Sequence, residues 1–164
     1  MRDLNAKLPG AESFTYKEFV RSQTALRKGI KNAPTEEEWV CLELLAKEVL
    51  QPIRDKFGRI RITSGFRSVE LCESVGSNSR SNHARGQAAD IEPLVGGVSL
   101  FDVLEFVHVN LEYRELIAEF FPVGWCHLAY RDGANNRQLK LKDVNHNYEI
   151  VSIDCVRGLY GNYI

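Results

Sequence analysis

Apolar residues recur at a helical period in the segment that follows residue 35. They form one stripe, which comprises Leu42, Leu45, Ala46, Val49 and Ile53, as expected for a helix that packs one face against a core. Thr35 and Glu38 have the spacing of a capping box, and the acidic residues 36–38 favour the positive end of the helix dipole. We therefore predict a helix that begins after Thr35, and we expect Pro52 to kink or end its regular part.

Other segments show either a helical or an alternating pattern. Short helical patterns follow Phe14 and cover residues 68–75 and 100–113. Polar and apolar residues alternate in the segments that we predict to be strands, which are residues 59–64, 87–92 and 125–130 and a closing hairpin of 138–144 with 148–153. Strands that follow helices without βαβ regularity indicate an α+β fold, which we expect to be a small antiparallel sheet with helices packed on one side. The length predicts one domain over residues 1–164.

Composition and charge exclude several classes of partner. The chain is 44% hydrophobic and 26% charged, with a formal net charge of −1, and this near-neutral balance argues against a nucleic-acid partner. No apolar run reaches the roughly 18–20 residues that span a bilayer, so we expect no membrane segment. The first residues lack the apolar core of a secretory signal. We therefore expect synthesis in the cytoplasm without a signal peptide, and a monomeric protein.

The four cysteines do not have the spacing of a zinc site. They are Cys41, Cys72, Cys126 and Cys155, and no two of them form a C-x-x-C pair. We expect reduced and mostly buried thiols.

The most informative stretch for chemistry is Ser81 to Asp90. A polar loop carries His83, Gly86 permits a sharp turn, and a strand of small residues carries Asp90. A carboxylate in such a strand is costly to bury unless it is paired or bound to a cation, and a histidine across the turn could be a second ligand. This spacing alone is equally consistent with a surface histidine and an aspartate that caps a turn or pairs with an arginine.

A second candidate ligand lies in the strand predicted at residues 125–130. Alternation places His127 on one face with Trp125, and Cys126 on the other face, so Cys126 should not join a metal held by His127. Taken singly, His127 also fits a half-buried histidine bonded to a backbone carbonyl. Together, His83, Asp90 and His127 form a three-ligand set with an open fourth position, which is typical of catalytic zinc.

These motifs resemble those of the zinc D-Ala-D-Ala carboxypeptidase family, which also includes phage L-alanyl-D-glutamate endopeptidases. The resemblance is carried by Ser64-Gly65-Phe66-Arg67-Ser68, by S-x-H-x-x-G-x-A-x-D at Ser81 to Asp90, and by the W-x-H of Trp125 to His127. It extends from about Phe14, through Arg27 to Asn32, to about Gln138. It implies a small sheet that carries a zinc site and a fold shared with the hedgehog signalling domain.

The resemblance also implies roles for individual residues. His83, Asp90 and His127 match the zinc ligands. Arg67 matches an arginine that helps to hold the substrate, although a structural salt bridge is a second reading of this residue. Ser81 matches a serine near the metal, and its second reading is a hydroxyl that orders the loop.

The general base is the least regular part of the resemblance. Family members often place an acid three residues before the last histidine ligand, and that position is Gly124 here. Other members place a glutamate about six residues before it, and the segment that ends at Glu119 resembles theirs. Glu119 lies eight residues before His127, so the turn between them would have to be longer. We predict Glu119 as the base, with Glu92 in reserve, and we assign no role to His108 or His146.

The sequence thus predicts a Zn²⁺-dependent peptidase that hydrolyses peptidoglycan stem peptides. It would be an endopeptidase or a DD-carboxypeptidase, and it would act on the cell wall after release, as a phage or prophage lysin does. One alternative is a zinc-stabilised cell-wall-binding or virion module without catalysis, which Gly124 and the long turn before His127 would favour. Another is a metal-free structural protein.

Overall fold

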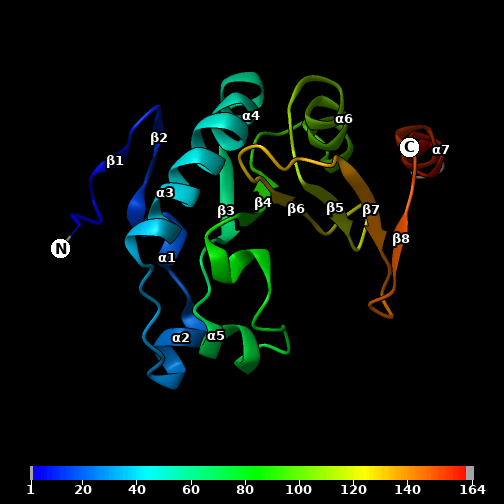
Figure 1. Ribbon diagram of the computed structural model, residues 1–164. Helices are drawn as coiled ribbons and strands as arrows, with labels where there is room; N and C mark the ends of the chain where they lie inside the picture. The colour runs from blue at the N-terminus through cyan, green and yellow to red at the C-terminus, as the bar shows by residue number, and fades with distance from the viewer. Residues whose placement is uncertain (1, 162–164) are drawn as a thin grey trace.

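The computed structural model describes residues 2–161 and shows an α+β fold (Figure 1). The helices are α1 (Tyr16–Val20), α2 (Gln23–Lys28), α3 (Glu36–Leu45), the π-helical η1 (Ala46–Leu50), α4 (Gln51–Phe57), α5 (Val69–Ser74), the 3₁₀-helical η2 (Asn82–Arg85), α6 (Leu100–Asn110) and α7 (Ile153–Gly161). The strands are β1 (Lys7–Leu8), β2 (Ala11–Thr15), β3 (Ile60–Ser64), β4 (Ala88–Pro93), β5 (Glu115–Glu119), β6 (Trp125–Ala129), β7 (Gln138–Lys142) and β8 (Tyr148–Ile150). The predicted fold class is confirmed.

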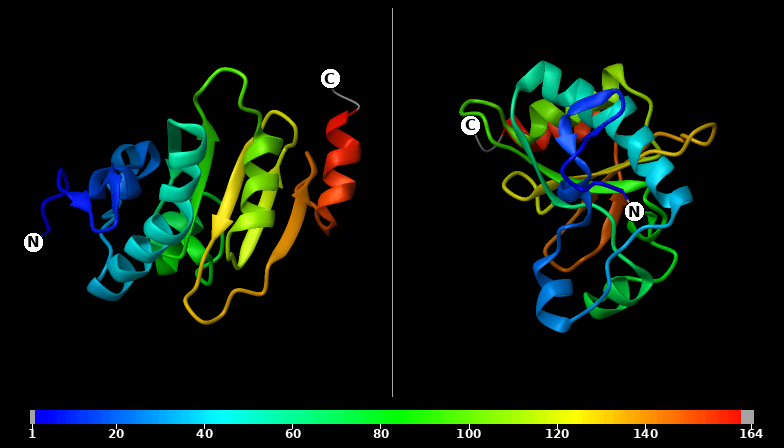
Figure 2. Two further views of the ribbon diagram at one scale, coloured as in Figure 1. Left: turned by 90° about the horizontal axis from the view of Figure 1, so that it is seen from above. Right: turned by 90° about the vertical axis from the view of Figure 1, so that its left-hand side faces the viewer.

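The central sheet has six strands in the order β3-β4-β6-β5-β7-β8. All neighbouring strands are antiparallel except β5 and β7, which run parallel, and β1 and β2 form a separate two-stranded sheet. Helices α4 and α6 cover one face of the central sheet (Figure 2). The loop before β4 and the turn between β7 and β8 extend toward the opposite side of the sheet (Figure 2).

The hydrophobic core lies between the sheet and these helices. The predicted stripe supplies Leu42, Leu45, Val49 and Ile53 to it, each fully buried. Alternate residues of the strands meet them, among them Ile91, Leu116, Cys126 and Leu128. Burial of this apolar surface is the main force that fixes the sheet against the helices.

The helix predicted after Thr35 forms, but Pro52 does not end it. Thr35 and Glu38 make the predicted capping box, and the chain stays helical through α3, η1 and α4 as far as Phe57. Pro52 lies in the first turn of α4, directly after the π-helical segment. The π-helical turn before it interrupts the regular hydrogen-bond pattern of the helix, and such an interruption can accommodate a residue without a backbone N–H.

Other boundaries differ from the sequence prediction. Helix α6 ends at Asn110 rather than at residue 113, and strand β5 and helix α7 were not predicted. All four cysteines are free thiols, but only Cys72 and Cys126 are buried, whereas Cys155 is exposed. Among the helices of residues 2–161, none has both the length and the apolar character that a bilayer crossing requires.

Candidate metal centre

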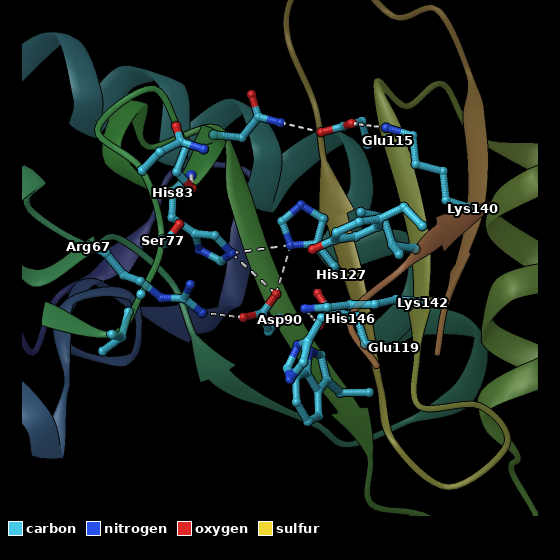
Figure 3. A pocket seen from close by; sticks show the side chains of 18 of the residues that line it. Arg67, Ser77, His83, Asp90, Glu115, Glu119, His127, Lys140, Lys142 and His146 are labelled. Atoms are coloured by element: carbon cyan, nitrogen blue, oxygen red, sulfur yellow. Dashed lines mark hydrogen bonds and ion pairs between the residues drawn. The ribbon is translucent and has the colours of Figure 1, made fainter. Parts of the chain in front are cut away.

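Two neighbouring strands and one short helix bring the three predicted ligands together. Asp90 on β4 and His127 on β6 are paired directly across the sheet, and His83 lies in η2 above them (Figure 3). One ligand atom from each residue lies within 4.8 Å of the other two, and all three side chains are buried. The structure therefore joins residues that are up to 44 positions apart in the sequence.

Local contacts fix the direction of the His83 ring. The Ser81 hydroxyl caps η2 by accepting a hydrogen bond from the His83 N–H at 3.3 Å. Gly86 ends η2 at φ 66°, and a Cβ atom there would lie 2.3 Å from the carbonyl oxygen of Glu38. The Nδ1 of His83 donates to the Gly65 carbonyl at 2.6 Å, because a carbonyl can only accept. Its Nε2 therefore faces the other two ligands.

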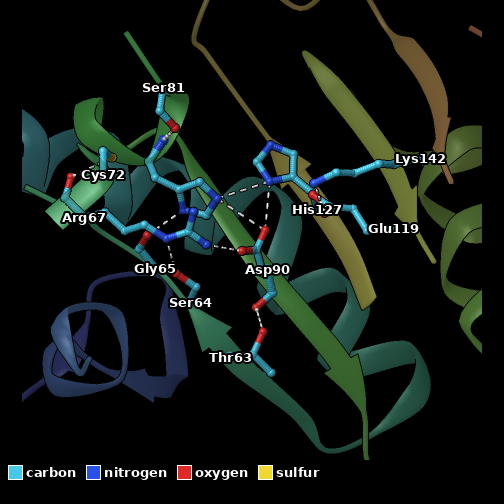
Figure 4. A network of polar contacts seen from close by, with 11 residues as sticks. Thr63, Ser64, Gly65, Arg67, Cys72, Ser81, Asp90, Glu119, His127 and Lys142 are labelled. Carbon is cyan, nitrogen blue, oxygen red and sulfur yellow. Dashed lines mark hydrogen bonds and ion pairs between the residues drawn. The ribbon is translucent and has the colours of Figure 1, made fainter. Parts of the chain in front are cut away.

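The Asp90 carboxylate uses its two oxygens for different partners. Oδ1 lies 2.8 Å from His127 Nδ1 and 3.3 Å from His83 Nε2. Oδ2 accepts a hydrogen bond from Arg67 at 2.5 Å, and Arg67 also donates to Ser64 at 2.7 Å (Figure 4). Burial alone would raise the pKa of Asp90, but the two histidines hold it well below its usual value. Asp90 is therefore ionised at neutral pH.

The donor set fits a divalent cation. Burial lowers the pKa of His83, so its ring is neutral and its Nε2 presents a lone pair. His83 Nε2 and His127 Nδ1 are 3.2 Å apart, and both face Asp90 Oδ1. Of these three atoms only His127 Nδ1 can carry a proton, so the other two compete for it as acceptors. A cation in place of that proton would satisfy all three. Nitrogen and carboxylate donors suit zinc, and zinc-bound histidines characteristically donate their other N–H to a carbonyl, as His83 does to Gly65.

Cys126 takes no part in this cluster, as the alternation of the strand predicts. Its side chain belongs to the hydrophobic core on the other face of β6. Burial raises the pKa of its thiol well above the usual value, so it does not form the thiolate that a metal needs.

A cleft of about 1000 Å³ opens beside the cluster. Residues 75–82 form one wall, and β5, β7 and His146 with Tyr148 form the other (Figure 3). Two lysine–glutamate pairs lie in the second wall. Lys142 Nζ donates to Glu119 Oε2 at 2.7 Å, and Lys140 Nζ donates to Glu115 Oε1 at 2.5 Å.

Glu119, the predicted base, lies in this cleft. Strand β5 places Ile117 opposite His127 and Glu119 opposite Trp125, so Glu119 faces the same side of the sheet as His127. Its Oε2 is held by Lys142, whereas its Oε1 accepts no hydrogen bond from any residue in the range 2–161. Burial alone would lower the pKa of Lys142, but its contacts with Glu119 and Tyr148 raise it, so the lysine is charged.

The turn between β5 and β6 explains the glycine at position 124. The Gly124 N–H donates to the Phe120 carbonyl at 3.1 Å, and a Cβ atom on Gly124 would lie 1.8 Å from the carbonyl oxygen of Glu119. No side chain fits there. The structure therefore excludes an acid three residues before His127 and places a carboxylate at the end of β5 instead.

The remaining candidates have simpler surroundings. Arg67 forms a salt bridge with Asp90, which is one of the two roles predicted for it. It also lines the cleft. Ser81 lines the cleft too, and its hydroxyl orders the loop. Glu92 pairs with Arg61 and does not line the cleft. His108 contacts the Tyr113 hydroxyl at 2.6 Å, away from the cluster.

Sequence reasoning missed part of the cleft wall. His146, to which no role was assigned, lines the cleft and packs against Phe120 with ring centroids 5.7 Å apart. Lys142 lies near two rings, 5.6 Å from that of Phe120 and 5.1 Å from that of Tyr148. The alternating Lys140 and Lys142 of the predicted hairpin were the available signal, because their spacing puts both on one strand face.

The amino-acid sequence matches a known protein family. Residues 12–112, more than half of the chain, match the family described as Peptidase M15. This range contains His83 and Asp90 and ends before β5 and β6, which carry Glu119 and His127. A search of curated proteins found no significant match. The length of the family match shows that this chain belongs to the Peptidase M15 family, in which zinc-dependent hydrolysis of peptidoglycan peptide bonds is the general activity.

Proposed function

We propose that this protein is a zinc-dependent peptidase of endopeptidase or DD-carboxypeptidase type, with His83, Asp90 and His127 as zinc ligands and Glu119 as the general base. One observation supports it most directly. The buried His83–Asp90–His127 cluster lies in the same cleft as a carboxylate with an unoccupied oxygen. Peptidoglycan stem peptides are the substrate class that the family implies.

The metal ligands and the residues around them have different chemical roles. A bound zinc ion supplies Lewis acidity, which polarises a carbonyl group and makes water a nucleophile at neutral pH. Arg67 keeps the Asp90 carboxylate oriented through Oδ2, which leaves Oδ1 directed at the two histidines. Gly65 does the same for His83 by accepting its Nδ1 proton.

Glu119 is the residue best suited to move the proton. Its free Oε1 can accept a proton from the attacking water and return it to the leaving amine nitrogen. Glu115 faces the same cleft, but Lys140 engages its Oε1 and Asn82 engages its Oε2. Glu92 lies outside the cleft. Of the three acids, only Glu119 combines position with an unoccupied oxygen.

Zinc analysis and peptidoglycan digestion test the proposal together. We expect about one zinc per wild-type chain, and loss of both zinc and hydrolysis in His127→Ala. His108→Ala is the matched control, since His108 lies outside the cluster, and it should keep both. Mass spectrometry of the released peptides would identify the bond that is cut. Zinc-loaded wild type that leaves the muropeptides unchanged would instead support the non-catalytic wall-binding module.

A further inference from the structure

A second hollow of about 560 Å³ adjoins the cleft. Arg67 and Val75 line both hollows, so they form a common wall between them. The remaining lining residues come from the junction of α1 and α2, from the end of β3 and from α5, and they are Arg21, Ser22, Gln23, Thr24, Thr63, Ser64 and Leu71. We call this hollow the Arg21 groove.

The Arg21 groove has a positive character. It is lined by two arginines and by no acidic residue. Arg67 already pairs with Asp90, whereas Arg21 is exposed and pairs with no acidic side chain within residues 2–161. One arginine therefore has its full charge available to a ligand.

Two hydroxyl groups that line the groove can act as donors. The Ser22 oxygen accepts from the Ala25 N–H at 3.2 Å, and the Ser64 oxygen accepts from Arg67 at 2.7 Å. Each hydroxyl has its own proton left to donate. Leu71 and Val75 add an apolar side. A cation, hydroxyl donors and an apolar wall together suit a carboxylate on a short aliphatic backbone.

We propose that the Arg21 groove is a subsite for a carboxylate of the peptide substrate, with Arg21 as its main specificity residue; this rests on the function proposed above. The distance is suitable. Ser64 is paired with Asp90 on adjacent strands, which separates their Cα atoms by about 5 Å. An extended peptide advances about 3.3–3.6 Å per residue. The Ser64 end of the groove therefore lies about two residues of extended peptide from Asp90.

A lysine-containing stem peptide offers two such carboxylates, at the C-terminus and on the D-glutamate residue. The experiment therefore uses three synthetic probes. One is L-Ala-γ-D-Glu-L-Lys-D-Ala-D-Ala, the second is its C-terminal amide, and the third carries D-isoglutamine in place of D-glutamate. Binding is measured by calorimetry in a zinc-loaded Glu119→Gln background, with and without Arg21→Gln. Arg59→Gln is the matched control, because Arg59 is an exposed arginine that lines neither hollow.

We expect Arg21→Gln to weaken binding of the first probe about tenfold, the scale of one charge-assisted contact. Of the two amidated probes, one should bind about tenfold more weakly than the first probe to the protein that retains Arg21. The same probe should lose no further affinity in Arg21→Gln. That amide identifies the carboxylate. Arg59→Gln should leave all three affinities unchanged. An equal effect of Arg21→Gln on all three probes, or no effect on any, would overturn the subsite.

The kinetics of otherwise wild-type protein separate the two proposals. If Arg21→Gln raises KM for the same probe and leaves kcat unchanged, both proposals hold. If the protein cleaves the probes with no dependence on Arg21, the subsite is wrong and the peptidase function stands. If it cleaves none of them while binding still depends on Arg21, the function is wrong and the subsite stands.

Discussion

The cleft contains two lysine–glutamate pairs of the same chemistry, Glu119 with Lys142 and Glu115 with Lys140. Both glutamates come from β5, four residues apart, and both lysines come from β7, two residues apart; all four belong to one face of the sheet. They differ in what else touches the carboxylate. Asn82 donates to Glu115 at 2.5 Å and so occupies its second oxygen, whereas the second oxygen of Glu119 has no partner among the described residues.

Because of this difference, the two pairs suit different roles. Glu115 links β5 to η2, the segment that carries His83, and so stabilises the wall of the cleft. Glu119 lies at the end of β5, where the chain turns, and it lines the cleft although most of its side chain is buried. An identical pair of residue types can thus be structural at one end of a strand and suited to proton transfer at the other.

Replacement of each glutamate by glutamine gives the strongest separation of the two pairs. Glu119→Gln should lower kcat by about 10²–10⁴-fold, the usual contribution of a general base. Glu115→Gln should keep most of the wild-type rate, since the amide can still contact Asn82. Initial rates on a soluble stem peptide, at matched zinc content, would measure both. A larger loss of kcat in Glu115→Gln than in Glu119→Gln would contradict the roles given to the two glutamates.

Replacement of each lysine by methionine should give a smaller separation. Lys142→Met releases Glu119 Oε2, and a misplaced base should cost about 10- to 100-fold in kcat. Lys140→Met leaves Glu115 held by Asn82, so its rate should stay close to that of the wild type. Lys142→Arg should recover part of the loss because it keeps the charge. Similar kcat values for the two methionine variants would show that Lys142 does not position the base.

The grouping of His83, Asp90 and His127 could be predicted because their motifs resemble those of a known family and most of the geometry behind them is local. The turn at Gly86 and the alternation of β4 place His83 and Asp90, and pairing of β4 with β6 is the one long-range step that adds His127. The position of Glu119, the proposed base, was harder to predict, because it depends on a turn. The contact that a side chain at position 124 would make with the Glu119 carbonyl appears only when β5 and β6 are paired.

The second wall of the cleft could not be predicted, for a related reason. Strand β5 joins β7 in parallel, and a parallel pair lacks the short connection that makes a hairpin visible in sequence. The contacts of Lys140 and Lys142 with β5 follow from that pairing. Asn82 is a polar loop residue by pattern, and only the fold brings it to Glu115.

The pH dependence of stability offers the finest test of the structural role of Glu115. Burial alone would raise the pKa of Glu115, but Lys140 lowers it below its usual value near 4.5. Above that value the folded and unfolded carboxylates are both ionised, so Glu115 contributes fully, by about 1 kcal/mol. As the pH falls toward the lower pKa of the folded state, the unfolded chain binds the proton first and this contribution disappears. The stabilities of wild type and Glu115→Gln from denaturant unfolding should therefore differ at pH 7, and the difference should shrink as the pH falls below about 4.5. A difference that is independent of pH would assign the stabilisation to packing rather than to the ion pair.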